Sequence, residues 1–212
     1  MTKTEIKVRL TFTMPVLGSL PGNKELLKTY VAGQAPTLAM AEEEIASVQD
    51  QIEKGTTVFA KDETSVWLWN YQVMGFTKNA IGTLIELGDV TALSKWQYKK
   101  AVDSFVQVHP RQVRFRNPDG SAVTRVGPAV ERPLRAETMQ GDRVAIARSE
   151  SVPEGCSIEF SVRLLQGSNE KSKTAVLTPD NIRAALDYGA FKGIGQWRGA
   201  GYGQFTWEEL KS

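Results

Sequence analysis

Hydrophobic and polar residues alternate strictly near the start of the chain. Between positions 5 and 14 the apolar residues are every second one: Ile6, Val8, Leu10 and Phe12. A period of two is typical of a strand with one buried face. The same alternation over residues 157–165 predicts a second strand of this kind.

Two segments have helical spacing instead. Apolar residues recur every three or four positions over residues 71–87, and Gly88 follows where such a helix would end. Thr178 and Pro179 begin a second helix, because threonine caps a first turn and proline is favoured just inside it. Its buried face is expected to consist of Ile182, Ala185, Leu186 and Phe191.

Weaker patterns complete the order of elements. Residues 56–59 and 66–69 predict a short hairpin, and residues 105–115 and 204–207 predict two further strands. Residues 121–141 have few apolar positions and no period, so they predict a long loop.

With insertions removed, the order is strand, helix, strand, strand, helix, strand. This is the ferredoxin-like βαββαβ pattern, which RNA-recognition modules share. We therefore expect one α+β, RRM-like domain over residues 1–212, with an acidic helical insertion at 24–55 and a long basic loop at 117–143. The fold hosts many functions, so function must come from a site.

Glycine is concentrated near the end of the chain. Residues 189–205 hold 6 of the 18 glycines, together with Lys192, Trp197, Arg198 and Tyr202. Flexible linkers are rich in glycine and serine and lack large aromatic residues. This composition favours a shaped loop that lets an anionic or nucleotide-bearing ligand approach the main chain.

Charge is distributed unevenly although the net charge is only +2. Residues 95–150 hold 11 Lys and Arg against 6 Asp and Glu, and eight of the basic residues are arginines. Arginine offers a planar fork that suits phosphates and stacked bases. A local basic excess on a nearly neutral protein is typical of nucleic-acid binding; the alternative is a solvated face with internal ion pairs.

Composition narrows the remaining classes of function. The single Cys156 excludes an internal disulfide and a multi-cysteine metal site, and is expected to be a small buried hydrophobe. His109 is the only histidine, which argues against histidine-based zinc sites; it is expected to be a structural residue within a strand. No apolar run is long enough for a membrane helix and no signal peptide is evident, so we expect a cytoplasmic protein without metal or cofactor.

Four segments together resemble the RAMP superfamily, the RNA-binding backbone subunits of CRISPR effector complexes. They are the first strand with its following Gly18, the hairpin and helix segments TVFAKD (57–62) and WNYQVMGFTK (69–78), the strand entry ESVPEGCSIEF (150–160) and the glycine-rich stretch 189–205. They occur in the family's order and span the beginning, middle and end of the chain.

The resemblance implies RNA binding through the backbone, often by subunits that stack along a guide RNA. It implies RNA contacts at the start of the first helix, in the glycine-rich loop and in a long basic loop. Target-cleaving members carry an aspartate after the first strand, but residues 15–23 contain none, and the lone His109 lies in a strand pattern. Both departures argue against cleavage, and the insertion at 24–55 suggests a divergent, stand-alone copy, for instance one carried by a phage.

Three hypotheses therefore stand. The first is a non-catalytic RNA-binding protein that also self-associates or joins CRISPR-type subunits. The second is a metal-independent endoribonuclease that uses His109 or Tyr202 as base, and the third is a viral interaction protein that mimics or blocks an effector complex. For the first, Lys78 is expected to contact phosphate, with a solvated helix lysine as its alternative. The predicted RNA-binding residues are Lys78, Arg132, Arg135, Arg143, Arg148, Lys192, Gly193, Gly195, Trp197, Arg198, Gly199 and Gly201.

Overall fold

The computed structural model describes residues 2–22, 56–90, 95–138, 141–166 and 177–211, with only the backbone described for residues 133–138 and 141–146. The predicted insertion at 24–55 lies outside these ranges. The described elements, in chain order, are β1 (Thr2–Phe12), β2 (Val16–Leu17), β3 (Leu20–Pro21), β4 (Thr56–Val58), β5 (Ala60–Lys61), β6 (Val66–Trp69), α3 (Asn70–Leu87), α4 (Tyr98–Phe105), β7 (Val106–His109), β8 (Gln112–Arg116), β9 (Gly127–Thr138), β10 (Gly141–Val152), β11 (Ser157–Gln166), α5 (Pro179–Asp187), η2 (Tyr188–Ala190), η3 (Arg198–Ala200) and β12 (Phe205–Glu209).

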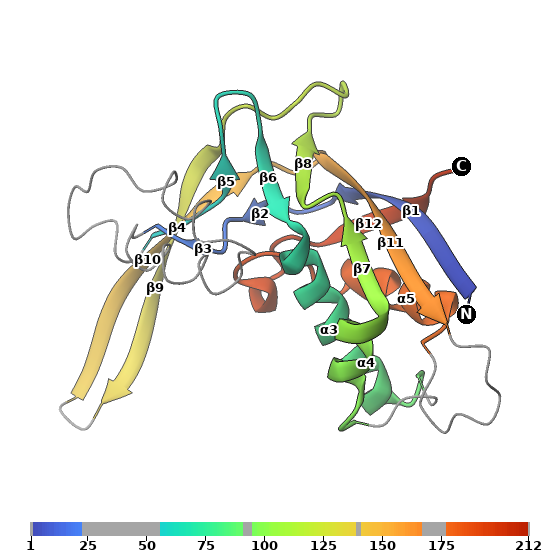
Figure 1. Ribbon diagram of the computed structural model, residues 1–212. Helices are drawn as coiled ribbons and strands as arrows, with labels where there is room; N and C mark the ends of the chain where they lie inside the picture. The colour runs from blue at the N-terminus through green and yellow to red at the C-terminus, as the bar shows by residue number, and fades with distance from the viewer. Residues whose placement is uncertain (1, 23–55, 91–94, 139–140, 167–176, 212) are drawn as a thin grey trace, which may run out of the picture.

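These elements form a mixed α+β fold with two mainly antiparallel sheets (Figure 1). The larger sheet has the order β12-β1-β11-β8-β6-β5, and β7 pairs with β11 beside β8. Strands β1 and β11 are paired antiparallel over ten positions. In the smaller sheet, β2 and β4 flank β10, β3 pairs with β4, and β9 pairs with β10.

The hydrophobic core lies between the larger sheet and helices α3 and α5. The alternating residues of β1 and β11 that the sequence assigned to a buried face are all buried, as are Phe115 and Phe205. Phe12 packs against both of these rings, at centroid distances of 5.7 and 6.1 Å. One cluster of buried residues thus contains residues from the first strand to the last.

The sequence predicted the end of α3 and the start of α5 correctly, whereas α5 ends at Asp187, before Phe191, which was assigned to its buried face. Helix α3 ends at Gly88, whose φ of 87° is the left-handed conformation that favours glycine at this position. Helix α5 begins at Pro179, and the Thr178 side chain accepts a hydrogen bond from the Asn181 amide. Helix α4 was not predicted, since its eight residues contain four polar or charged ones.

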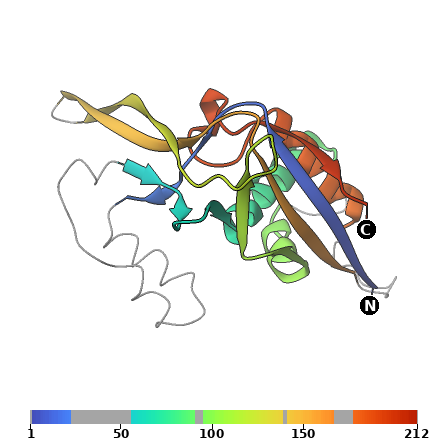
Figure 2. The same cartoon turned by 90° about the horizontal axis from the view of Figure 1, so that it is seen from above.

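The long loop predicted for residues 121–141 is wrong. Most of it is β9, which forms a long antiparallel hairpin with β10 (Figures 1 and 2). The hairpin projects from the body of the molecule, so little of it faces a core that would impose alternation. The predicted strand over 105–115 is also divided, into β7 and β8, at the cis peptide bond between His109 and Pro110.

The outer face of the larger sheet, opposite the helices, is bridged by ion pairs across β12, β1 and β11. Arg9 lies directly opposite both Glu159 and Glu208, and its guanidinium approaches their carboxylates at 2.7 and 2.8 Å. These contacts raise the pKa of Arg9, the hydrogen bond with Glu159 contributing most. Arg163 and Glu5 form another cross-strand pair at 3.2 Å.

Asp62 shapes the turn between β5 and β6. Its Oδ1 accepts hydrogen bonds from the Thr64 hydroxyl and from the amides of Thr64 and Ser65, at 2.6 to 2.8 Å. The Thr64 hydroxyl, the Thr64 and Ser65 amides and nearby Arg114 together lower the pKa of Asp62.

Replacing Asp62 by asparagine is expected to reduce the loss of stability in acid. A carboxylate whose folded-state pKa is lowered stabilises the fold above its unfolded pKa, and this contribution is lost as the pH falls through the lower, folded value. Asp62→Asn keeps an acceptor but has no proton to bind. Urea unfolding between pH 7 and pH 3 should therefore show a smaller drop for the variant than for the wild type, and an unchanged drop would contradict the assignment.

Candidate nucleic-acid interface

The glycine-rich loop is a packed structure. A Cβ atom on Gly193 would lie 1.9 Å from the carbonyl carbon of Gly203, and one on Gly203 would lie 1.9 Å from the carbonyl oxygen of Ile194. The Ile194 amide donates to the Gly203 carbonyl at 3.0 Å. Two segments of the loop therefore cross with their backbones in contact, which requires glycine at both positions.

The loop also packs on β2. The Gln196 amide donates to the carbonyl of Leu17, the Gly203 amide donates to that of Pro15, and Gly195, at φ 97°, lies against the Leu17 carbonyl. Gly193 and Gly195 were predicted to leave room for a ligand, but the chain's own backbone occupies the space beside them. Gly199 and Gly201 face open space, and only these two of the predicted glycines have room for a ligand beside them.

Trp197 is the only described non-glycine residue with a positive φ, at 53°. The left-handed conformation is unfavourable for a bulky side chain, and such residues persist where the surrounding structure fixes them, frequently at functional sites. Trp197 precedes η3, and its carbonyl accepts from the Ala200 amide. Its ring contacts Tyr202 edge-on, at 6.1 Å between centroids.

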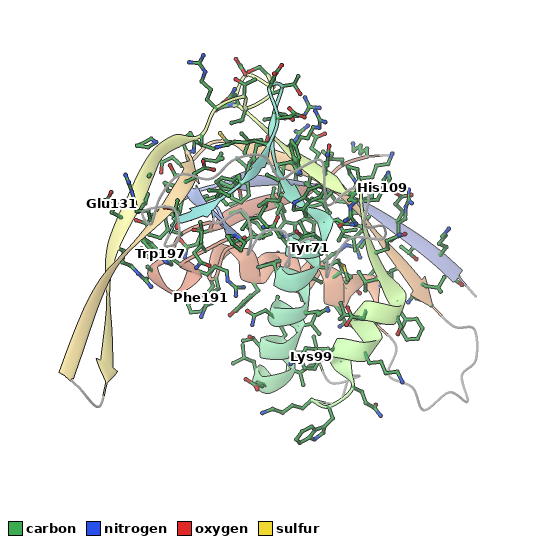
Figure 3. The ribbon with its side chains drawn as sticks, turned by 60° about the vertical axis from the view of Figure 1, so that its left-hand side comes forward. Tyr71, Lys99, His109, Glu131, Phe191 and Trp197 are labelled. Atoms are coloured by element: carbon green, nitrogen blue, oxygen red, sulfur yellow. The ribbon has the colours of Figure 1, made fainter. Side chains whose placement is uncertain are left out.

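Arg132 of β9 joins the hairpin to this loop. Its guanidinium carbon lies 4.3 Å from the centre of the Trp197 ring, well within the range of a cation–π contact. Figure 3 shows Trp197 beneath the base of the hairpin, close to Glu131. Among the described residues no carboxylate pairs with Arg132. The structure thus brings together two residues that the sequence predicted separately.

The other hairpin arginines are placed differently. Arg148 is opposite Glu131 in the β9–β10 register, and its Nε lies 2.8 Å from a Glu131 carboxylate oxygen. Neighbouring residues of a strand face opposite sides, so Arg148 and Glu131 lie on the side away from Arg132. Arg135 and Arg143 belong to the hairpin, but their side chains lie outside the described part of the chain.

The prediction that residues 117–143 form a basic segment is also wrong. Residues 117–143, predicted as a basic loop, hold four arginines and four acidic residues and are therefore neutral. The excess of the central segment comes from residues 95–116, which hold six basic residues and one acidic one. Two of these six lie within cation–π range of indoles: the guanidinium carbon of Arg111 is 5.3 Å from the Trp69 ring centre, and that of Arg114 is 5.8 Å from the Trp67 ring centre.

Those two tryptophans belong to a small second core. Trp67 and Trp69 are buried with Leu20 of β3 on the outer face of β6, while Val66 and Leu68 face the main core. The Trp67 indole nitrogen is buried without a described hydrogen-bond partner. Because both rings are buried, they do not offer an exposed surface to a partner protein.

Lys78 does not lie at the beginning of its helix. Helix α3 begins at Asn70, so Lys78 is in the third turn, where the backbone amides are already paired. Its ammonium forms an ion pair with Asp103 of α4. The predicted place of Lys78 at a helix N-terminus is therefore wrong, and its contact with RNA stays a prediction.

Two further basic residues of the loop are described. Arg198 makes one long hydrogen bond of 3.5 Å to Asn79 of α3, and Lys192 has no ion-pair partner within the described residues. Both side chains are partly exposed and retain donors for an anion.

Sequence reasoning missed the position of Phe191. It was assigned to the buried face of α5, but 75% of its surface is exposed. The chain turns into η2 after Asp187, which carries Phe191 off the helical face that holds Ile182, Ala185 and Leu186. The exposure of a large aromatic residue beside Lys192 could not be read from helical periodicity.

The two residues considered as a catalytic base, His109 and Tyr202, do not lie together. His109 is the last residue of β7, within a strand as predicted, but its side chain is exposed, and Figure 3 shows it on the other side of the molecule from Trp197. Cys156 is buried as predicted, and burial raises the pKa of its thiol. Within the described residues, no group of three or more His, Cys, Asp or Glu is arranged to hold a metal ion.

The segment 150–160 has a structural role at the junction of the two sheets. One Glu150 carboxylate oxygen accepts from the Phe59 amide at 3.0 Å, and the other pairs with Lys61. The Gly18 amide donates to the Glu150 carbonyl. Gly155, at φ 81°, forms the turn that leads into β11.

No family model and no curated protein matches this chain. Among solved structures, a chain of a Type IV-B CRISPR complex matches with a TM-score of 0.47 and 11% identity, covering 99% of this chain and 91% of that one. A chain in the cryo-EM structure of the Type III-B Cmr-beta bound to cognate target RNA matches with a TM-score of 0.41 and 10% identity. That match covers 99% of this chain, which spans 59% of the matched chain. At this similarity the matches assign no function. In the described helices no stretch is long and apolar enough to cross a membrane.

Proposed function

We propose that the protein is a non-catalytic, RAMP-type protein that binds the backbone of single-stranded RNA where the β9–β10 hairpin meets the glycine-rich loop. The observation that carries this proposal is Arg132 stacked on Trp197. Stacking fixes the plane of the guanidinium and leaves its N–H donors available at the edge, the geometry that suits a phosphate.

The topology is consistent with the proposal. We infer that β1, α3, β7–β8, β11, α5 and β12 are the six elements of a ferredoxin-like βαββαβ core, with the sheet order that this pattern requires. On the outer sheet face Arg9 is already paired with Glu159 and Glu208, and these three side chains together carry a net charge of −1, which does not favour phosphate. We therefore place the RNA at the hairpin–loop junction rather than on the sheet.

At this junction Arg132, Lys192 and Arg198 supply three positive charges from two segments. Gly199 and Gly201 leave room beside them. Of the two candidate bases of the endoribonuclease hypothesis, Tyr202 lies at this junction with its ring against Trp197, and His109 lies on the other side of the molecule. We propose that the site binds RNA without cleaving it. The same interface would serve within a CRISPR-type ribonucleoprotein or a homo-oligomer, and the compartment would be the cytoplasm.

Binding to RNA should depend strongly on salt. Fluorescence anisotropy with a labelled 20-nucleotide single-stranded RNA should show affinity falling as salt rises, with a logarithmic slope of about −0.7 per phosphate contacted. Arg198→Ala should reduce the slope by about one contact. Arg183→Ala is the matched control, because this arginine is already paired with Asp180 and Glu209. Wild-type protein that fails to bind RNA at low salt, about 50 mM, would overturn the proposal.

A further inference from the structure

The aromatic side chains of the glycine-rich loop differ in what they contact. The Trp197 ring is covered on one face by Arg132 and is approached edge-on by Tyr202. The Phe191 ring, by contrast, is 75% exposed and contacts only Tyr188 among the described rings, at 5.9 Å. Phe191 is therefore the aromatic surface of the loop that remains open.

The backbone beneath Phe191 is fixed. Its amide donates to the Tyr188 carbonyl at 3.0 Å, and its carbonyl accepts from the Gln204 side chain at 2.9 Å. Gly189, two residues earlier, packs against the ring of Phe205, where a Cβ atom would lie 2.1 Å away. An exposed ring on an anchored backbone loses little conformational freedom when a ligand stacks on it.

The surroundings indicate the chemistry of that ligand. Lys192 follows Phe191 directly and has no ion-pair partner within the described residues. Arg198 belongs to the same loop, and Arg132 of β9 contacts the loop at Trp197. In Figure 3 Phe191 and Trp197 are both at the end of the molecule from which the hairpin projects. A flat apolar surface with cations beside it matches a nucleotide, whose base stacks while its phosphate pairs.

We infer that Phe191 is a stacking platform for one unpaired nucleobase, with Lys192 at the adjacent phosphate. This assignment rests on the proposed function and gives Arg132 and Phe191 separate roles in binding. Arg132, held by Trp197, binds the backbone, and Phe191 distinguishes a single strand from a duplex. Because every base has a stacking face, the platform tolerates any sequence.

The test compares Phe191→Ala and Phe191→Trp with Trp96→Ala. Trp96 is 92% exposed and lies outside the loop, which makes it a matched control for the loss of an exposed aromatic side chain. The probes are a labelled 20-nucleotide single-stranded RNA and the duplex of the same length. Phe191→Ala should weaken single-strand binding about 10-fold or more, leave the salt slope unchanged and leave duplex binding unchanged. Phe191→Trp should bind at least as tightly as the wild type.

The outcomes separate this inference from the proposed function. If the wild type binds RNA and Phe191→Ala binds it equally well, the stacking platform is overturned while the proposed function stands. Equal weakening toward single strand and duplex also overturns it. If Phe191→Ala keeps its RNA affinity but loses self-association in sedimentation velocity, the exposed ring is a protein contact. Wild-type protein that binds neither probe overturns both.

Discussion

Gly193→Ala is expected to destabilise the fold by about 3 kcal/mol or more. The new methyl group would lie 1.9 Å from the Gly203 carbonyl carbon, and both contacting groups are backbone, so no side-chain rotation can relieve the overlap. The two crossing segments would have to separate, breaking the Ile194–Gly203 hydrogen bond and withdrawing Ile194, which is buried in the core. For a chain of this size the change corresponds to a melting temperature lower by about 6–12 °C.

Gly199→Ala is the matched control within the same loop. A Cβ atom at Gly199 meets nothing within 4 Å, and no positive φ is needed there. Its melting temperature, measured by circular dichroism or scanning calorimetry, should stay close to that of the wild type. Equal melting temperatures for the two variants would show that the loop crossing does not contribute to stability as the contacts imply.

The sequence predicted those elements whose residues face a core on one side. Strands β1 and β11 alternate because the larger sheet buries one face against α3 and α5, and both helices carry explicit start or stop residues. The two strands of the hairpin β9–β10 pair with each other along their length but have little core beneath them. The strands of this hairpin are therefore held by backbone hydrogen bonds, which impose no alternation of hydrophobic and polar residues on the sequence.

The candidate site was only partly predictable for a related reason. The concentration of glycine marked the loop, but composition could not distinguish Gly193, which packs on backbone, from Gly199, which faces open space. Likewise the arginines of the hairpin are equivalent in sequence. Only the strand register shows that Arg148 is opposite Glu131 while Arg132 reaches Trp197. Lys78 lies in the third turn of α3, away from the helix N-terminus at which its phosphate contact was predicted.

Arg132→Ala is expected to weaken binding to single-stranded RNA by about 10–100-fold, the range for one hydrogen-bonded charge contact. Arg148→Ala removes the same side chain from the partner strand of the same hairpin. Because Arg148 faces the other side and is paired with Glu131, its loss should change affinity less than about threefold. Anisotropy titrations of the two variants at one salt concentration provide a direct comparison.

The same measurement on Trp197 variants tests why Arg132 is effective. If the indole positions the guanidinium, Trp197→Ala should weaken binding nearly as much as Arg132→Ala, and the double variant should be little weaker than either single one. Trp197→Phe keeps a ring for the arginine and should retain most of the affinity. Additive losses in the double variant would instead mean that Trp197 contacts the RNA itself, independently of Arg132, and that the stacked pair does not act as a unit.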